Sequence, residues 1–136
     1  MICRALLLVP ALIFSLGFPA AVFAAEKLPA GFIALAEDRM KWDDAKAFCE
    51  QKGGRLPRID NKDSRALINR SHVKHVEGFG APGGKMPAGL RADYYWGGTE
   101  NPDRSDQAWH IDGRGGEFDV NASHKTNTRR VVCVPK

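Results

Sequence analysis

Two widely separated cysteines, Cys49 and Cys133, constrain what this chain can fold into more than any other feature of its sequence. A third, Cys3, lies in an N-terminal segment that we expect to be removed. In a chain bound for an oxidising compartment, the remaining two allow a single pairing. On the loop-entropy model, a bridge of this span raises the free energy of the unfolded chain by about 4 to 5 kcal/mol, a large part of a small domain's net stability. The alternative is two free thiols packed as small apolar side chains.

Residues 1–24 are typical of a secretory signal peptide. A basic residue precedes the apolar run 5–18, and Val22 and Ala24 suit the positions just before a signal peptidase cut. A retained membrane anchor is the alternative, but the run is shorter than the roughly 20 residues that a spanning helix needs, and prolines interrupt it. The sequence therefore predicts an exported protein, periplasmic or secreted. It has one domain over residues 25–136 and no membrane insertion after signal cleavage.

The charge pattern excludes one class of partner. The chain has 20 basic and 16 acidic residues, a formal net charge of +4, and the two signs alternate along its length. A nucleic-acid-binding surface would instead gather basic residues into a stripe with interleaved aromatic residues. We therefore expect a mixed, solvated surface and no nucleic-acid partner.

A short strand and a helix are predicted at the start of the domain. Residues 32–35 are apolar and are typical of a strand. From Trp42 to Cys49 apolar residues recur at helical spacing, and Gly53 ends the pattern. We expect Cys49 to point inward from this helix.

A second helix and a long loop are predicted next. Residues 56–59 read as an extended linker, and Asn61 suits the N-cap of a helix from Lys62 to about Arg70. Residues 78–89 are too rich in Gly and Pro for the interior of a helix or strand, so they form a loop. Loops on a rigid scaffold often carry recognition, which makes this loop a candidate binding region.

The C-terminal part predicts a small antiparallel sheet. Strand patterns run over residues 94–98, 107–111 and 128–134, with a weaker one over 117–120, and residues 112–116 supply the turn of a hairpin. The last strand would return the C-terminus to the first helix. The predicted fold class is therefore α+β, with two helices and a small antiparallel sheet closed by one long-range disulfide.

Several motifs, in order, resemble the C-type-lectin-like domain family. They are MKWDDAKAFC (40–49), GGRLPRI (53–59), YWGGTE (95–100), AWHIDG (108–113) and RVVCV (130–134). The resemblance covers about residues 31–135 and is closest to the bacterial branch found at the end of the collagen-like adhesin of Legionella. It implies a C-type-lectin-like fold, an adhesin-like recognition role, and a disulfide from the first helix to the final strand.

The family's calcium site has only a partial counterpart. Its second disulfide and its Trp-Asn-Asp motif are missing, and the turn Glu100-Asn101-Pro102-Asp103, with Asp106 close behind, carries a Glu-Pro-Asn-like tripeptide in a different order. Calcium takes about six to eight oxygen ligands, and the others would have to come from Asp119, Asn121 or Asn127. The alternative is an acidic turn that faces water. We expect no bound metal and no cofactor.

Aromatic residues of the predicted strands form either a ligand platform or core. We expect core for Trp96 and Trp109, because each buries a large apolar area. Tyr94 and Tyr95 cannot both face inward from one strand. The predicted ligand-binding residues are Tyr94, Glu100, Asn101, Asp103 and Asp106.

No catalytic constellation is recognisable. His72 and His75 are three apart, but zinc needs two further ligands, and His110 and His124 are isolated. We expect all four histidines to be on the surface or partly buried. Without a nucleophile and base in a recognisable order, the chain is not expected to be an enzyme.

The sequence predicts an exported, non-enzymatic recognition module that binds a glycan or a cell-envelope or surface protein. Binding would use loop 78–89 and turn 99–106, without calcium. The alternatives are a calcium-dependent carbohydrate-binding lectin, an enzyme built on a lectin-like core, and a structural subunit of a surface assembly.

Overall fold

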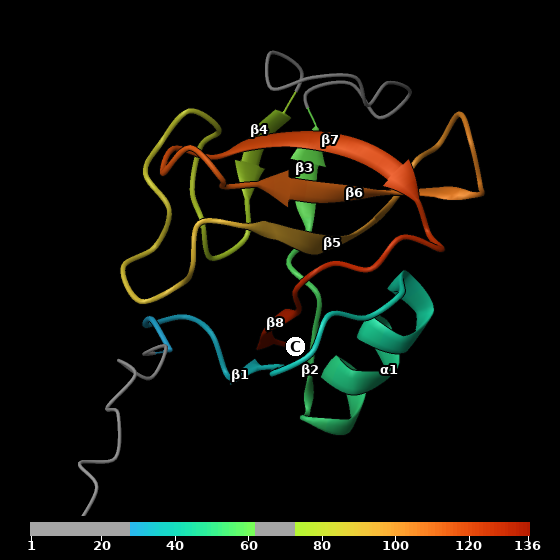
Figure 1. Ribbon diagram of the computed structural model, residues 1–136, viewed down its shortest axis with the longest axis horizontal. Helices are drawn as coiled ribbons and strands as arrows, with labels where there is room; N and C mark the ends of the chain where they lie inside the picture. Colours follow the sequence, from blue (N-terminus) through green and yellow to red (C-terminus); the bar gives the residue numbers. More distant parts are fainter. Residues whose placement is uncertain (1–27, 62–72) are drawn as a thin grey trace, which may run out of the picture.

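The computed structural model describes residues 28–61 and 73–136, which form one helix and eight strands (Figure 1). Their bounds are β1 Ala34–Leu35, α1 Trp42–Gln51, β2 Gly54–Arg55, β3 Ile59–Asn61, β4 Val73–Val76, β5 Tyr94–Glu100, β6 Gln107–Asp112, β7 Asp119–His124 and β8 Val132–Pro135.

The strands of the described residues pair into three small antiparallel sheets, in the orders β1-β8-β2, β3-β4 and β5-β6-β7. Because β8 lies between β1 and β2, the last strand of the chain holds two early strands together. In Figure 1 the β5-β6-β7 sheet occupies the upper half of the molecule, and α1 lies below it with β1, β2 and β8.

The α+β fold class predicted from the sequence is wrong. The described residues are mostly β, with a single helix and three small sheets in place of two helices and one sheet. The second helix was predicted over residues 62–70, which lie outside the described residues, and Asn61, its predicted N-cap, is the last residue of β3. The strands β2 and β3 are defined by backbone pairing with β8 and β4, and two or three residues are too few to show a period.

The later strands are confirmed with shifted bounds. Those predicted over 94–98 and 107–111 are β5 and β6, and the β6–β7 hairpin turns where the glycines predicted it. The weak strand over 117–120 is the longer β7. Only the second half of the strand predicted over 128–134 becomes β8.

The helix α1 forms where the sequence predicted it. Two acidic residues occupy its first turn, where they complement the helix dipole, and Gly53, at φ +80°, follows its end. Its buried residues are Trp42, Ala45 and Cys49. The indole Nε1 of Trp42 donates a hydrogen bond of 2.9 Å to the carbonyl of Gly97, which fixes the start of α1 against β5.

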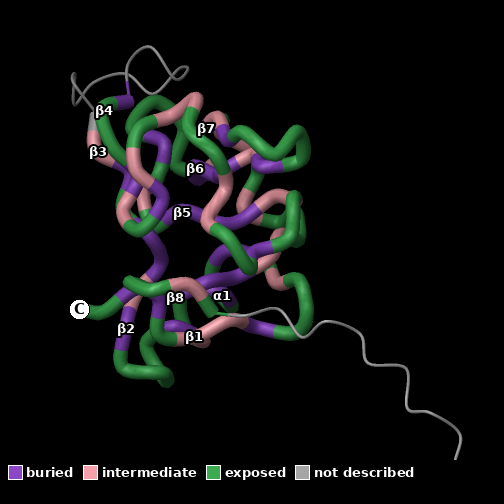
Figure 2. The backbone as a smooth tube through the Cα atoms, turned by 90° about the vertical axis from the view of Figure 1, so that its left-hand side faces the viewer, coloured by how far each residue is buried: buried purple, intermediate pink, exposed green. Residues whose placement is uncertain are grey.

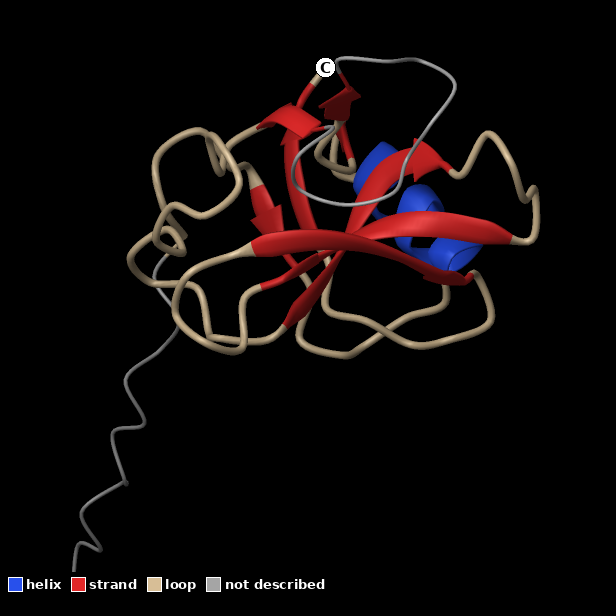
Figure 3. Cartoon of the chain, turned by 90° about the horizontal axis from the view of Figure 1, so that it is seen from above, coloured by secondary structure: helices blue, strands red, loops and turns tan. Residues whose placement is uncertain are grey.

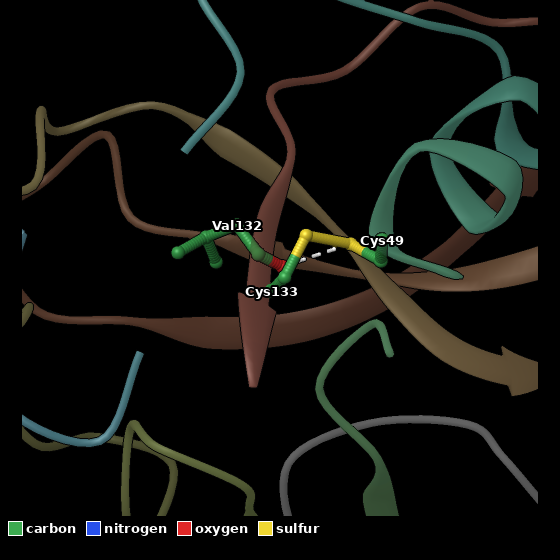
Figure 4. Close-up of a disulfide and its surroundings, with 3 residues drawn as sticks. All are labelled: Cys49, Val132 and Cys133. Atoms are coloured by element: carbon green, nitrogen blue, oxygen red, sulfur yellow. Dashed lines mark hydrogen bonds between the residues drawn. A yellow bond between two sulfur atoms is a disulfide. The ribbon is translucent and has the colours of Figure 1, made fainter. Parts of the chain in front are cut away.

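A disulfide joins Cys49 of α1 to Cys133 of β8, with their Cα atoms 5.4 Å apart (Figure 4). The predicted pairing is confirmed, and both cysteines are fully buried. The bridge ties the helix to the sheet that contains the first and last strands. A disulfide of this kind indicates a non-cytoplasmic environment.

Two apolar clusters form the core, seen as the buried stretches in Figure 2. The larger packs one face of β5-β6-β7 against β3, β4 and the loop segments, and the smaller joins α1 to β5 and β8. The larger contains Phe32, Ile59, Val73, Val76, Phe79, Leu90, Tyr95, Trp109, Ile111, Phe118, Val120, Val132 and Val134. The smaller contains Ala36, Trp42, Ala45, Cys49, Leu56, Trp96, Ala108, Val131 and Cys133.

The predicted loop 78–89 is confirmed as a segment without a helix or a strand, but it is tied to the β6–β7 turn. The N–H of Gly83 donates to the carbonyl of Phe118 at 2.7 Å, and the N–H of Met86 donates to the carbonyl of Gly116 at 2.8 Å. Phe79 is buried with its ring against Phe118, at a centroid distance of 5.6 Å. This part of the loop is therefore held against the β6–β7 turn and the core.

Seen from above, strands pass in front of α1, which lies behind them (Figure 3). Among the residues that the structure describes, no helix has both the length and the apolar character needed to cross a membrane.

Candidate functional site

One face of the β5-β6-β7 sheet, the inner face, packs into the larger core cluster, and the opposite face is buried with α1 at Trp96 and Ala108 but partly open around Tyr94. Side chains alternate along a strand, and Tyr95, Trp109 and Ile111 of the inner face belong to the larger core cluster. The register pairs Trp96 with His110 and His110 with Asn121. The opposite face, which we call the outer face, therefore carries Tyr94, Trp96, Ala108, His110, Asp112, Asn121 and Ser123, of which Trp96, Ala108 and His110 are buried.

Tyr94 lies at one end of this face, where β5 begins opposite the last residue of β6. It is half-buried, and two guanidinium groups lie over its ring, that of Arg114 at 4.2 Å and that of Arg129 at 4.3 Å from the ring centroid. The ring of His110 meets it edge-on at 5.2 Å. Cation–π contacts of this kind hold planar cations beside an aromatic ring. We use the term arginine cluster for Arg39, Arg114, Arg129 and Arg130, which lie around Tyr94.

Asp93 pairs with two members of the arginine cluster. Its Oδ2 accepts hydrogen bonds from Arg39 and, at 2.7 Å, from Arg130 Nε. Burial acts to raise the pKa of Asp93, but the hydrogen bonds from Arg130, the N–H of Tyr94 and Arg39 outweigh it, so the pKa lies below its usual value. Asp93 is therefore ionised at neutral pH and balances part of the cluster's charge.

Asp112 pairs with Arg114 in a fork, with Nε and Nη2 donating to the two carboxylate oxygens at 3.0 Å each. These hydrogen bonds lower the pKa of Asp112. Bidentate pairing fixes the plane of the Arg114 guanidinium against Tyr94.

Arg129 is the member of the cluster with no carboxylate within ion-pairing distance in residues 28–61 and 73–136. Its Nε is buried and has no hydrogen-bond partner among these residues. Burial lowers the pKa of Arg129, and the charge of Arg39 adds to this effect. The backbone of Arg129 is held firmly, because its N–H and C=O both pair with Met40, at 3.0 and 2.9 Å. The site thus presents a fixed cation whose charge is not neutralised by direct contact.

His110 is buried, so the prediction that it lies on the surface or is only partly buried is wrong. Its side chain is 4% exposed because it lies between the rings of Tyr94 and Trp96, and its Nδ1 is 3.1 Å from the hydroxyl of Ser123. Burial, followed by the charge of Arg129, lowers its pKa to about 4. The imidazole is therefore neutral at pH 7 and adds no charge to the site.

Of the predicted ligand-binding residues, only Tyr94 lies in the arginine cluster. Glu100 is the last residue of β5, and Asn101, Asp103 and Asp106 lie in the turn that leads to β6. Asn101 is buried: its Nδ2 donates to Gln107 at 3.1 Å and its Oδ1 accepts from the N–H of Asp103 at 3.0 Å. Asn101 therefore holds the turn together.

Glu100 and Asp106 lie close to basic side chains. Glu100 pairs with Lys125, and Asp106 pairs with His124 at 3.2 Å and with Arg104 at 3.5 Å. Asp103 is exposed. No group of three or more His, Cys, Asp or Glu side chains that could hold a metal ion occurs in the described parts of the chain.

The two tryptophans are confirmed as core. Trp96 and Trp109 are fully buried, as is Tyr95, while Tyr94 is half-buried, so the two tyrosines face opposite sides as predicted. Tyr94 is thus the one member of the predicted aromatic platform that keeps partial exposure. His75 is exposed on β4, and His72 lies outside the described residues.

A cavity of about 300 Å³ adjoins the arginine cluster. It is lined by Leu35, Ala36, Glu37, Arg91 and Arg130. Arg130 belongs to both the cavity lining and the arginine cluster.

Sequence reasoning missed the arginines of this site. Arg39, Arg114 and Arg129 come from three distant segments, and each alone looks like an ordinary surface cation. The available signal was the pair Arg129-Arg130 just before the last strand. Adjacent side chains of an extended segment point to opposite sides, so one arginine of a segment that pairs with β5 must turn toward the protein.

Comparison of the chain with protein-family models, with curated proteins and with solved structures finds no match in any of the three. The resemblance to C-type-lectin-like domains stays a prediction from the sequence.

Proposed function

We propose that this protein is an exported, non-enzymatic recognition module that binds a glycan on the outer face of the β5-β6-β7 sheet, without a metal ion. The observation that carries the proposal is the arginine cluster around Tyr94, a fixed group of charged side chains beside a half-buried ring at the open end of the outer face.

The rigidity of this surface supports a binding role. The strand β5 is paired with β6, its Tyr94 carbonyl accepts the N–H of Arg130, and the N–H of Trp96 donates to the carbonyl of Arg130, at 3.0 Å each. Side chains that are already fixed lose little conformational freedom when a ligand binds, which favours affinity.

The sequence supports the same role from a second direction. The motifs that resemble C-type-lectin-like domains include YWGGTE, and β5, which carries all of it, also carries Tyr94. The predicted signal peptide and the disulfide both support a location in the periplasm or outside the cell.

A glycan array, repeated in calcium and in excess EDTA, tests the proposal. We expect binding to one group of glycans that EDTA does not weaken. A Tyr94→Ala variant should lose this binding, while Arg58→Gln, an exposed arginine of the β2–β3 linker, should keep it. Melting curves of both variants show whether they are folded. Binding that requires calcium, or that survives in Tyr94→Ala, contradicts the proposal.

A further inference from the structure

We infer that the outer face recognises the carboxylate of an acidic saccharide, and that the guanidinium of Arg129 is the group that pairs with it. This inference rests on the proposed function and adds the chemical class of the ligand.

The first step is the charge balance of the arginine cluster. Arg114 is matched by Asp112, and Arg39 and Arg130 share Asp93. Arg129 donates no hydrogen bond from its guanidinium to any described residue, and its buried Nε has no acceptor. A partly buried cation without a direct partner is unfavourable in the free protein, and a bound anion removes that penalty.

The second step is the shape of the group. A guanidinium presents planar, paired N–H donors that match the two oxygens of a carboxylate. Stacking on Tyr94, at 4.3 Å, fixes the plane of the Arg129 guanidinium, and the two backbone hydrogen bonds to Met40 fix its base. Its half-buried position leaves part of the side chain open to solvent. A carboxylate can therefore be bound there without first ordering the arginine.

The third step is the evidence that the ligand is a saccharide and not a protein. Protein interfaces gather apolar side chains at their centre. The exposed large hydrophobic residues in the described parts of the chain are Leu28 and Ile33, and both belong to the segment that includes β1. The outer face instead carries the exposed amide of Asn121 beside the hydroxyl of Ser123. Such groups suit a ligand rich in hydroxyls.

Calorimetric titration of the disulfide-bonded protein with galacturonic acid oligosaccharides tests the inference. The matched probe is the same oligosaccharide with its carboxyl groups methyl-esterified, which keeps the hydroxyls and removes the charge. We expect the free acid to bind about tenfold or more tightly than the ester. This comparison needs no variant, so misfolding cannot imitate its result.

Two variants locate the effect. Arg129→Gln should lower affinity for the free acid about tenfold or more and leave the ester unchanged. Arg129→Lys keeps the charge but loses the planar fork, and we expect it to recover only part of the affinity. Arg58→Gln, which changes an exposed arginine elsewhere, should bind like the parent protein.

Three outcomes overturn the inference. Acid and ester binding equally would show that charge is not recognised, while the proposed function would stand. Arg129→Gln binding the acid as tightly as Arg58→Gln would remove Arg129 from the site. Tight binding of an acidic peptide, with no binding of either oligosaccharide, would show that the ligand is a protein and not a saccharide. If no glycan of any kind binds, the proposed function fails as well.

Discussion

The backbone of Gly54 in β2 lies so close to the carbonyl of Val134 in β8 that a Cβ atom at position 54 would be 2.3 Å from that oxygen. The two strands are paired in register, Gly54 opposite Pro135 and Arg55 opposite Val134. The carbonyl of Val134 cannot move away from position 54 without disturbing the pairing of β2 with β8. Glycine at this position is therefore a requirement of the pairing between β2 and β8.

Gly54→Ala should destabilise the domain by about 1 to 3 kcal/mol, as overpacking of a close contact does. Gly115→Ala is the matched control, because a Cβ atom there meets nothing within 4 Å. Urea unfolding followed by tryptophan fluorescence measures both. Equal midpoints for the two variants would contradict the close approach of β2 to β8.

Loss of the disulfide should be the most destabilising change. A Cys49→Ala, Cys133→Ala double variant should lose about 4 kcal/mol of unfolding free energy, because the bridge closes a loop with a sequence separation of 84 residues. Chemical denaturation of the variant and of the oxidised parent protein gives the difference. A loss below 1 kcal/mol would mean that packing of α1 on β8 suffices without the covalent link.

His110 should make the fold sensitive to mild acid. Its pKa falls from 6.5 to about 4 on folding, so the unfolded state binds the proton more readily. The resulting stability is complete above pH 6.5 and is lost as the pH falls toward 4, by about 3 kcal/mol in total. Asp93 and Asp112, whose pKa values are lowered from 3.8, act below this range.

Urea midpoints measured between pH 4 and pH 7 test this dependence. The dependence of the urea midpoint on pH should become weaker in His110→Gln, because glutamine at position 110 does not titrate. It should persist in His75→Gln, which changes an exposed histidine of β4. A parent protein with the same midpoint across this range would contradict the burial of His110.

Asn101 should matter for stability and not for ligand binding. Asn101→Ala removes two side-chain hydrogen bonds from a buried position and should cost about 1 to 2 kcal/mol. Asp103→Asn, a change in an exposed neighbour, should leave the melting temperature nearly unchanged. If Asn101→Ala instead melted normally and lost glycan binding, the turn between β5 and β6 would be part of the binding site.

The features that sequence could predict are those set by local pattern or by counting. The helix α1 follows from the spacing of Trp42, Ala45 and Cys49 and from Gly53, and the bridge follows from two cysteines with one possible pairing. The strands β5 and β6 follow from aromatic and branched residues with turn residues between them.

The features that sequence did not predict depend on contacts between distant segments. The strands β2 and β3 are too short to show a period, and they form because β8 and β4 are there to pair with them. At the site, Tyr94 was found from its strand position. Arg129 was not predicted, because its place in the candidate site depends on two features of the fold. Its guanidinium lies over the Tyr94 ring, and its buried Nε has no hydrogen-bond acceptor nearby among the described residues.

The bond between Cys49 and Cys133 turns most of the domain into a closed covalent ring that contains β2, β3, β4, β5, β6 and β7. One proteolytic cut anywhere inside this ring opens it but releases nothing, since both new ends remain attached through the two sulfur atoms. In a protease-rich surrounding, the protein would tolerate a nick in an exposed turn and keep its outer face assembled.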